Sequence, residues 1–262
     1  MNVTSIDWAD MTWNPVTGCL HGCPYCYAAQ VAKRFGGFSE ERAAEGVGPY
    51  ERAHVLDASM KRLQKNGKMA AAPFPFYFEP TLHRYRLGEP AKANLPRNIF
   101  VCSMADLFGR WVPTDWIAEV LDACLAAPQH NYLFLTKNPA RYMELDHLAL
   151  LPRKGNFWYG STVTNEETPY FYSDKHNTFL SVEPMQGPMH GTGKLATDWV
   201  IVGAETGHRI GKTTPKTEWV LDLAEECEHA GVPIFMKQNL VTEGVLTRGE
   251  LVRQRPPGMT FA

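Results

Sequence analysis

Eight short apolar segments recur along this chain at intervals of about 20 to 40 residues, and segments with helical patterns lie between them. This alternation is typical of βα units that build a parallel sheet. The 262 residues match the roughly 250 residues of one closed βα barrel. The sequence therefore predicts a single α/β domain over residues 1–262, a parallel barrel of TIM type that is complete or nearly complete, with six to eight strands. The predicted strands are residues 11–18, 74–80, 98–104, 131–137, 156–163, 177–184, 198–205 and 233–239.

The segments between these strands predict helices and one insertion. Residues 114–127 and 218–231 are amphipathic, so each can lay an apolar face on a sheet. Residues 53–66 predict a further helix. Residues 35–50 are rich in glycine and glutamate, and they predict a surface insertion rather than a linker between domains.

The charge balance and the hydropathy exclude some classes of protein. The chain has 26 basic and 28 acidic residues, so it lacks the overall positive charge of a protein that holds nucleic acid non-specifically. A nucleic-acid partner stays open but has no support from the net charge. The sequence has no run of 18 apolar residues and does not start like a secretory signal, so we expect a cytoplasmic protein without a membrane partner.

Three of the six cysteines lie within eight residues, at Cys19, Cys23 and Cys26. In a reducing compartment such a cluster favours a metal-binding or catalytic role over a disulfide framework. A structural zinc site needs four ligands, and His21 sits awkwardly between the first two cysteines to supply one. Three thiolates fit a [4Fe-4S] cluster better, because the fourth iron then stays open for another ligand. Zinc and plain buried thiols remain the alternatives.

Polar side chains stand at the carboxyl ends of the predicted strands. In a parallel barrel those ends converge on one rim, where the active sites of this architecture are built. Two alternatives are that polar residues simply end apolar strands, and that the charged ones form an ion-pair network that braces the barrel. The polar residues at these ends are Glu79, Ser103, Asp106, Thr136, Lys137, Thr164, Asn165, Glu183, Glu205, Lys237 and Gln238. Those taken as site residues are Glu79, Ser103, Thr136, Lys137, Glu183, Glu205 and Lys237.

The cysteine motif also carries a family resemblance. The C-x3-C-x2-C spacing with Tyr25 before the third cysteine resembles the signature of the radical S-adenosylmethionine (SAM) enzymes. The resemblance implies a [4Fe-4S] cluster on the three cysteines, SAM on the open iron, and Tyr25 near the adenine. It also implies that Glu79 contacts the SAM amino group, although Tyr77 and Phe78 replace the two glycines of the family motif.

Further motifs narrow the resemblance to a phage and bacterial branch of radical-SAM-like proteins whose function is unknown. They cover nearly the whole chain, from about Trp13 to Asn239. The motifs are Trp13-Asn14-Pro15 before Gly18-Cys19, Ser103 to Phe108, Leu135 to Lys137, Leu180 to Pro184, Val202 to Gly207, and Lys237-Gln238.

The resemblance implies an enzyme that cleaves SAM reductively to a 5′-deoxyadenosyl radical, which abstracts hydrogen from a substrate such as a nucleotide or nucleic acid. A low-potential donor such as flavodoxin or ferredoxin would supply the electron. Ser103 and Thr136 would contact SAM. The catalytic candidates are Lys137, Glu183, Glu205 and Lys237. The alternatives are a non-catalytic barrel with a structural iron–sulfur or zinc site, acting as a binding or regulatory module, and a DNA-repair lyase.

Overall fold

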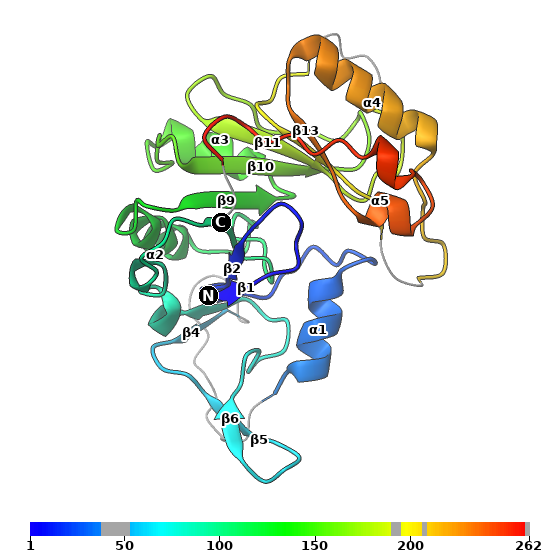
Figure 1. The fold of residues 1–262 in the computed structure, drawn as a ribbon. Helices are drawn as coiled ribbons and strands as arrows, with labels where there is room; N and C mark the ends of the chain where they lie inside the picture. The colour runs from blue at the N-terminus through cyan, green and yellow to red at the C-terminus, as the bar shows by residue number, and fades with distance from the viewer. Residues whose placement is uncertain (38–52, 190–194, 206–208, 260–262) are drawn as a thin grey trace.

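An eight-stranded sheet forms the centre of the computed structural model, which describes residues 1–37, 53–189, 195–205 and 209–259 (Figure 1). The strands lie in the order β1-β2-β8-β9-β10-β11-β12-β13. All neighbouring pairs are parallel except β1 with β2. The strands are β1 (Asn2–Val3), β2 (Met11–Trp13), β8 (Asn98–Val101), β9 (Asn131–Thr136), β10 (Phe157–Val163), β11 (Asn177–Val182), β12 (Val200–Val202) and β13 (Ile234–Met236).

This sheet is open, so the expected TIM barrel is wrong. The edge strands β1 and β13 do not pair with each other. The outer edge of β13 hydrogen-bonds instead to the C-terminal segment: the Met236 amide donates to the Val252 carbonyl (2.8 Å), and the Gln254 amide donates to the Ile234 carbonyl (2.8 Å). At the opposite edge, β1 pairs with β2. The antiparallel β1 thus occupies the free side of β2, and the C-terminal segment occupies the free side of β13, so the parallel strands at the two ends of the sheet do not meet to close a barrel.

Helices cover one face of the sheet. Helices α2 (Thr114–Leu125) and α3 (Ala140–His147) pack on the part built by β8, β9 and β10, where Val101, Phe134 and Tyr159 lie side by side. Helix α4 (Thr217–Ala230) packs on β11, β12 and β13. The short helix α5 (Asn239–Thr242) follows β13 directly. The buried side chains alternate along each strand, so every second residue faces these helices.

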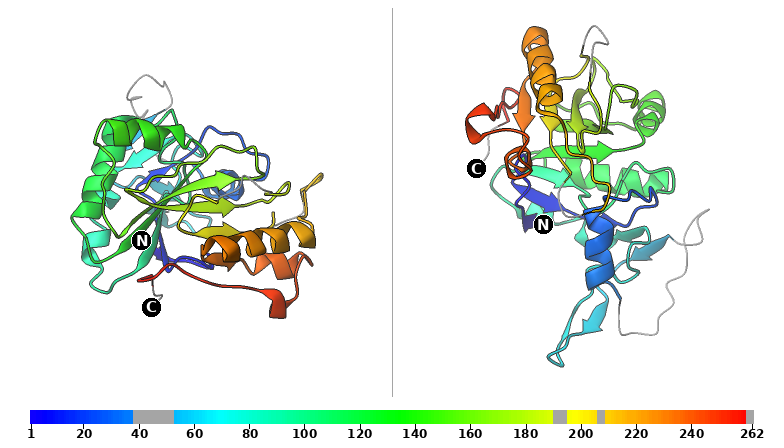
Figure 2. Two further views of the ribbon diagram at one scale, coloured as in Figure 1. Left: turned by 90° about the horizontal axis from the view of Figure 1, so that it is seen from above. Right: turned by 90° about the vertical axis from the view of Figure 1, so that its right-hand side faces the viewer.

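The opposite face of the sheet is packed with large side chains. Phe100, Leu133 and Trp158 come from adjacent strands, and they join a cluster that contains Phe179, Trp199 and Phe235. The segment from Ile6 to Ala9 and the side chain of Met259 belong to the same cluster. Segments near the two ends of the chain therefore close this face where the other face has helices, and Figure 2 shows the N-terminus near the sheet.

The chain between β2 and β8 forms a smaller lobe with two short sheets. One has the order β3-β7-β4, and the other is the hairpin of β5 and β6, which projects from the body of the molecule (Figure 1). Helix α1 (Tyr27–Phe35) also belongs to this region. The lobe's strands are β3 (Val16–Thr17), β4 (His54–Leu56), β5 (Lys61–Leu63), β6 (Met69–Ala71) and β7 (Thr81–His83). The 3-10 helices in the described part of the chain are η1 (Arg84–Arg86), η2 (Pro90–Lys92) and η3 (Arg248–Glu250).

Two predicted elements in this lobe are wrong. Residues 74–80 form turns instead of a strand, and the strand of this region is β7, which follows them. Pro73, Pro75 and Pro80 explain this, because proline has no N–H to donate to a ladder. Residues 53–66 form β4 and β5 instead of a helix, because they find partners in β7 and β6. Residues 38–50 of the predicted insertion lie outside the described residues.

The remaining sequence-based elements are confirmed. Six predicted strands correspond to β8 through β13, and the seventh, residues 11–18, divides into β2 and β3. The predicted helices correspond to α2 and α4. Helix α4 ends at Gly231, whose φ of 68° lies in the left-handed region where glycine costs no side-chain strain. None of the helices in the described ranges combines the length and apolar character that a membrane crossing requires.

Candidate functional site

A pocket of about 860 Å³ lies at the carboxyl ends of the parallel strands. Side chains at or just beyond the ends of β8, β9, β11, β12 and β13 line it, together with the cysteine loop and the start of α1. In Figure 1 the arrowheads of β9 and β10 point to the same side as α1. In open α/β sheets, ligand sites lie outside the carboxyl ends of the strands. The pocket has this position, and its volume is within the range of small-molecule sites.

All but one of the sequence-predicted site residues line this pocket. The exception is Glu79, whose Oε2 lies 2.7 Å from Nε2 of His54, in the small sheet. The rings of His54 and Phe76 stack with their centroids 3.8 Å apart, which holds the imidazole beside the carboxylate. The residues that the pocket brings together are Cys19, Cys23, Tyr25, Cys26, Ser103, Thr136, Lys137, Glu183, Glu205 and Lys237.

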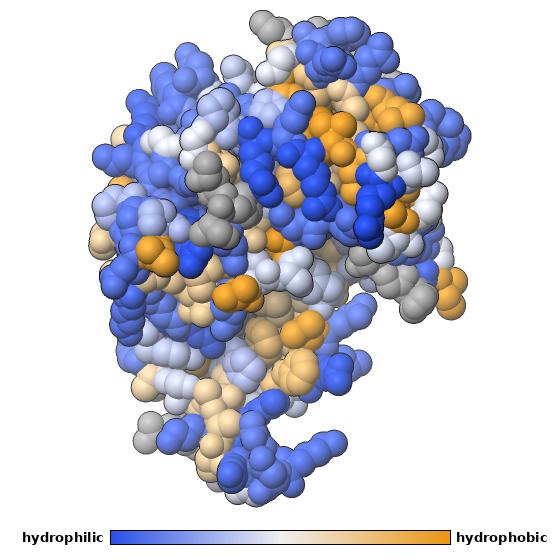
Figure 3. All heavy atoms as spheres, in the orientation of Figure 1, coloured by the Kyte–Doolittle hydropathy of each residue, from blue (hydrophilic) through white to orange (hydrophobic). Residues whose placement is uncertain are grey.

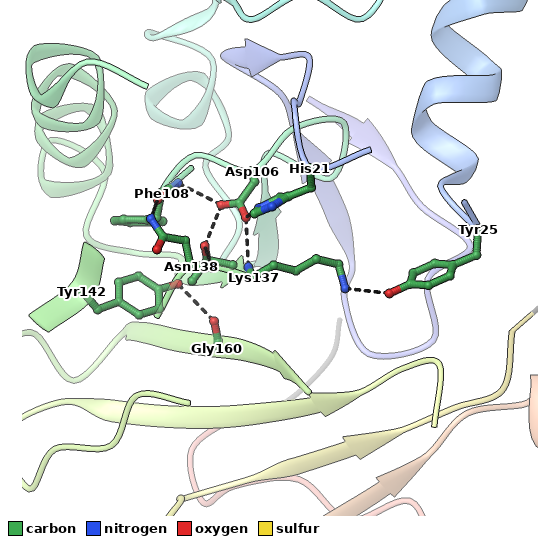
Figure 4. A network of polar contacts seen from close by, with 9 residues as sticks. His21, Tyr25, Asp106, Phe108, Lys137, Asn138, Tyr142 and Gly160 are labelled. Carbon is green, nitrogen blue, oxygen red and sulfur yellow. Dashed lines mark hydrogen bonds and ion pairs between the residues drawn. The ribbon is translucent and has the colours of Figure 1, made fainter. Parts of the chain in front are cut away.

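A buried carboxylate, Asp106, organises one wall of the pocket (Figure 4). Its Oδ1 accepts hydrogen bonds from the Thr136 hydroxyl (2.7 Å) and the Phe108 amide (3.0 Å). Its Oδ2 accepts the Lys137 amide (2.9 Å) and lies 2.7 Å from Nε2 of His21. Each oxygen therefore has two hydrogen-bond partners, as the burial of a carboxylate requires.

The contact with Asp106 fixes the tautomer of His21. A carboxylate oxygen accepts, so Nε2 of His21 carries a proton, and in the tautomer with a single proton the lone pair is on Nδ1. The ring also meets the edge of Trp111, with centroids 4.7 Å apart at 80°. The His21 side chain keeps 22% of its surface exposed and lines the pocket. An imidazole oriented by a buried carboxylate is the arrangement of a general base.

Lys137 contributes a cation to the pocket that is not neutralised by a carboxylate among the described residues. Its Nζ donates a hydrogen bond to the Tyr25 hydroxyl (3.2 Å), as Figure 4 shows, and lies 5.3 Å from the centroid of that ring. The side chain is half-buried. Because a tyrosine hydroxyl does not compensate a full charge, this ammonium favours an anionic ligand.

The other charged residues of the pocket form pairs. Lys237 donates to Oε1 of Glu183, which also accepts from the Asn239 side chain (3.1 Å). Arg209 donates two hydrogen bonds to the buried Glu205, at 2.7 and 2.8 Å. These bonds from Arg209 hold the pKa of Glu205 below its ordinary value, so its carboxylate is charged at neutral pH. The predicted acids are thus matched by cations of the same rim.

Ser103 and Thr136 already have partners within the protein. Ser103 donates to the Asn14 side chain (3.2 Å), and Thr136 donates to Asp106. Thr136 also accepts the amide of Asn138 (2.9 Å). Both hydroxyls therefore shape the wall of the pocket.

Trp8 lines the floor of the pocket and carries a donor without an acceptor. Its side chain is buried, with the residue 2% exposed, and Nε1 has no hydrogen-bond partner among the described residues. The ring packs against Phe100, with centroids 4.6 Å apart. A buried indole N–H without a partner costs free energy, and a ligand with an acceptor group would remove that cost.

The three cysteines do not fit the metal cluster that the sequence predicts. Among the residues that the structure describes, no group of three or more His, Cys, Asp or Glu side chains is placed to hold a metal ion. The expected [4Fe-4S] cluster and the SAM bound to it are therefore wrong, and a zinc site in this loop meets the same objection. The Cys26 sulfur caps α1 by accepting the Ala29 amide (3.4 Å), and burial raises the pKa of Cys19 to about 12.

The raised pKa of Cys19 predicts a slow reaction with alkylating agents. At pH 8 the thiolate fraction of a thiol with a pKa of about 12 is about a thousandfold smaller than that of a thiol with the ordinary pKa of 9.0. We therefore expect iodoacetamide to label Cys19 at least about a hundredfold more slowly in the folded protein than in urea, and the rate to rise with pH beyond pH 9. Mass spectrometry of the labelled peptide measures both rates. Equal rates would contradict the burial of a neutral thiol.

The sequence interpretation counted Asp106 among the polar residues at the strand ends but gave it no role, and it considered His21 only as a zinc ligand. The signal for Asp106 was its place after β8, in the segment from Ser103 to Phe108. The pairing with His21 joins positions 85 residues apart and becomes visible only in the folded chain. No feature of the sequence predicted that Trp8 lines the pocket, because an apolar residue near the start of a chain does not indicate a pocket. Thr206 and Gly207, from one of the motifs, lie outside the described residues.

An open parallel sheet with a charged pocket at its carboxyl edge defines an α/β protein of the open-sheet class. The model of one protein family, described as "Protein of unknown function (DUF5131)", matches residues 3–250. The chain belongs to this family. Neither the comparison with curated proteins nor the comparison with solved structures found a match.

Proposed function

We propose that this protein is an enzyme whose active site is the pocket, and that its substrate is an organic molecule of nucleotide size with an aromatic part and an anionic group. The observation that carries the proposal is the combination of an oriented base and an unneutralised cation in one pocket, His21 on Asp106 and Lys137 on Tyr25. Lys137 binds the anionic group, and His21 moves a proton at Nδ1. The unpartnered Nε1 of Trp8 favours a ligand with a hydrogen-bond acceptor at the floor.

The chemistry proposed is proton transfer. The radical chemistry implied by the family resemblance needs an iron–sulfur cluster, which the placement of the three cysteines does not fit. The aromatic rings of the pocket, Trp8, Phe78 and Phe100, offer apolar surface for a planar group. The pairs Glu183–Lys237 and Glu205–Arg209 supply polar walls that orient the rest of the molecule.

Binding is the first part of the test. We expect millimolar mononucleotides to raise the melting temperature of the wild type, and the rise to disappear in Lys137→Gln, because the variant lacks the cation. Lys154→Gln, an exposed lysine on a loop between α3 and β10, is the matched control and should keep the wild-type response. No rise with any mononucleotide or with phenyl phosphate would contradict the substrate class.

Turnover is the second part. The nucleotide that stabilises the protein most is incubated with wild type and His21→Gln, and the products are followed by mass spectrometry. Loss of a general base lowers the rate by about 10²- to 10⁴-fold, while binding through Lys137 should persist. Tight binding without any product from the wild type would instead favour the binding or regulatory module that was the alternative from the sequence.

A further inference from the structure

The small lobe carries a concentration of positive charge that the net charge of the chain conceals. We define the basic arm as residues 33–37, at the end of α1, and residues 58–72, which contain the β5–β6 hairpin. These two segments contain no Asp or Glu, whereas the whole chain has a net charge of −2. Their cations are Lys33, Arg34, Lys61, Arg62, Lys65 and Lys68.

The two segments of the basic arm lie against each other in the fold. Nη1 of Arg62 donates to the Phe35 carbonyl (2.6 Å), which ties the hairpin to the end of α1. Between them is a hollow of about 590 Å³. Its lining consists of Arg34, Phe35, Arg62, Leu63, Gln64, Lys65 and Asn66. Figures 1 and 2 show the hairpin projecting from the body below α1, and Figure 3 shows that hydrophilic residues dominate its tip.

Aromatic rings accompany the cations. Phe35 is 39% exposed, and the guanidinium carbons of Arg34 and Arg62 lie 5.1 and 6.0 Å from its ring centroid. Tyr77 is 56% exposed, and its ring lies so close to Gly36 that a Cβ there would meet Cδ1 of Tyr77 at 2.4 Å. Exposed rings between basic side chains are the arrangement that single-stranded nucleic acids use, because bases stack on the rings while phosphates meet the cations.

We propose that the basic arm binds single-stranded nucleic acid, with phosphates along its lysines and arginines and a base stacked on Phe35. The absence of Asp and Glu from the arm means that a polyanion meets no repulsion from its side chains. Helix α1 connects the arm to the pocket, since its first residues line the pocket and its last residue lines the hollow. Its nine residues span about 13 Å. This binding does not depend on the chemistry proposed for the pocket.

Fluorescence anisotropy with labelled dT20 and rU20 tests the proposal on the full chain. We expect binding whose logarithmic affinity falls linearly with the logarithm of salt concentration. In Lys33→Gln/Lys65→Gln/Lys68→Gln, three exposed cations are removed, so the affinity should fall about tenfold or more at low salt. The salt slope should also fall by about 2, given about 0.7 per phosphate contact on a single strand.

A variant with the same change in net charge is the control. Lys92→Gln/Lys154→Gln/Lys175→Gln removes three exposed lysines outside the arm and should bind like the wild type. Phe35→Leu keeps an apolar side chain but loses the ring, and we expect at least about a fivefold loss of affinity. Thermal unfolding of each variant shows whether it is folded.

Three outcomes would overturn the proposal. They are the absence of binding to both oligonucleotides, equal losses in the arm and control triple variants, and equal affinity for poly-glutamate, which has the charge but not the bases. None of these outcomes bears on turnover in the pocket, so the proposal can fail while the proposed enzyme stands, and the reverse is also possible.

Discussion

Asp106→Ala is expected to lower the free energy of unfolding by about 3–5 kcal/mol, because several donors in the buried wall lose their acceptor at once and each unsatisfied donor costs about 1–3 kcal/mol. The carboxylate is buried and accepts the Phe108 amide, the Thr136 hydroxyl and the Lys137 amide besides His21. Alanine has no side-chain acceptor for these donors, and the cavity that the substitution leaves adds to the loss of stability. Urea unfolding followed by circular dichroism measures the change.

Two further variants test whether the loss of stability comes from the hydrogen bonds of Asp106. Asp106→Asn keeps the shape, but its amide nitrogen must face two donors, because each oxygen of Asp106 accepts two hydrogen bonds. We therefore expect a loss of about 1–3 kcal/mol for it. Asp122→Ala, at an exposed position of α2, should change stability by no more than about 0.5 kcal/mol. A loss below 1 kcal/mol for Asp106→Ala would show that the network does not hold the wall of the pocket.

Gly18→Ala is expected to lower the free energy of unfolding by about 3 kcal/mol or more. Gly18 has a φ of 89°, where a side chain is strained, and a Cβ there would lie 2.2 Å from the Glu79 carbonyl oxygen. The obstacle is backbone, which cannot rotate away as a side chain can. The Gly18 amide also donates to the Met104 carbonyl (2.9 Å), so the cysteine loop would have to leave this contact or push residues 79–80 aside.

Gly22→Ala is the matched control in the same loop. Gly22 also has a positive φ, 67°, but a Cβ there would meet no atom within 4 Å. Only the conformational strain remains, so we expect a loss of about 1–2 kcal/mol. The difference between the two variants measures the close approach of Gly18 to residue 79. Equal losses would mean that the segments do not touch.

The hydrophobic pattern predicted most of the central sheet. Residues 131–137, 156–163 and 177–184 are short segments rich in aromatic and aliphatic residues, and they form the central strands β9, β10 and β11. Such segments identify strands that are buried on both faces. The pattern failed in the small lobe, where each strand has only two or three residues and is too short to show a period. Residues 53–66 are the example, since β4 and β5 pair with β7 and β6.

Strand pairing at the edges could not be predicted from the strand count. The alternation of strands and helices is the same for an open sheet and for a closed barrel. The outcome depends on what hydrogen-bonds to β13, and this is the segment around Val252 and Gln254, which has no strand pattern of its own. An irregular segment that blocks an edge leaves no periodic signal, so the barrel expectation was wrong for a physical reason.

The residues of the candidate site were likewise predicted only in part. Residues placed after a strand, such as Lys137, Glu183, Glu205 and Lys237, were identified because a parallel sheet brings the carboxyl ends of its strands together. Glu79 failed this rule because residues 74–80 are not a strand of that sheet, and its carboxylate lies beside His54 instead. Of the ion-pair network that was one alternative from the sequence, the pair of Glu183 with Lys237 is present. The partners of the other two residues were not predicted, since Glu205 pairs with Arg209 and Lys137 contacts Tyr25.

The sequence by itself determined the strands of the parallel sheet and the edge at which polar side chains gather, because hydrophobic periodicity and strand direction are local properties of the chain. The tertiary structure decided whether the sheet closed, whether three nearby thiols could share a metal, and which charges met. These outcomes depend on distances between segments far apart in the chain, such as His21 with Asp106, and on burial, which keeps the Cys19 thiol neutral.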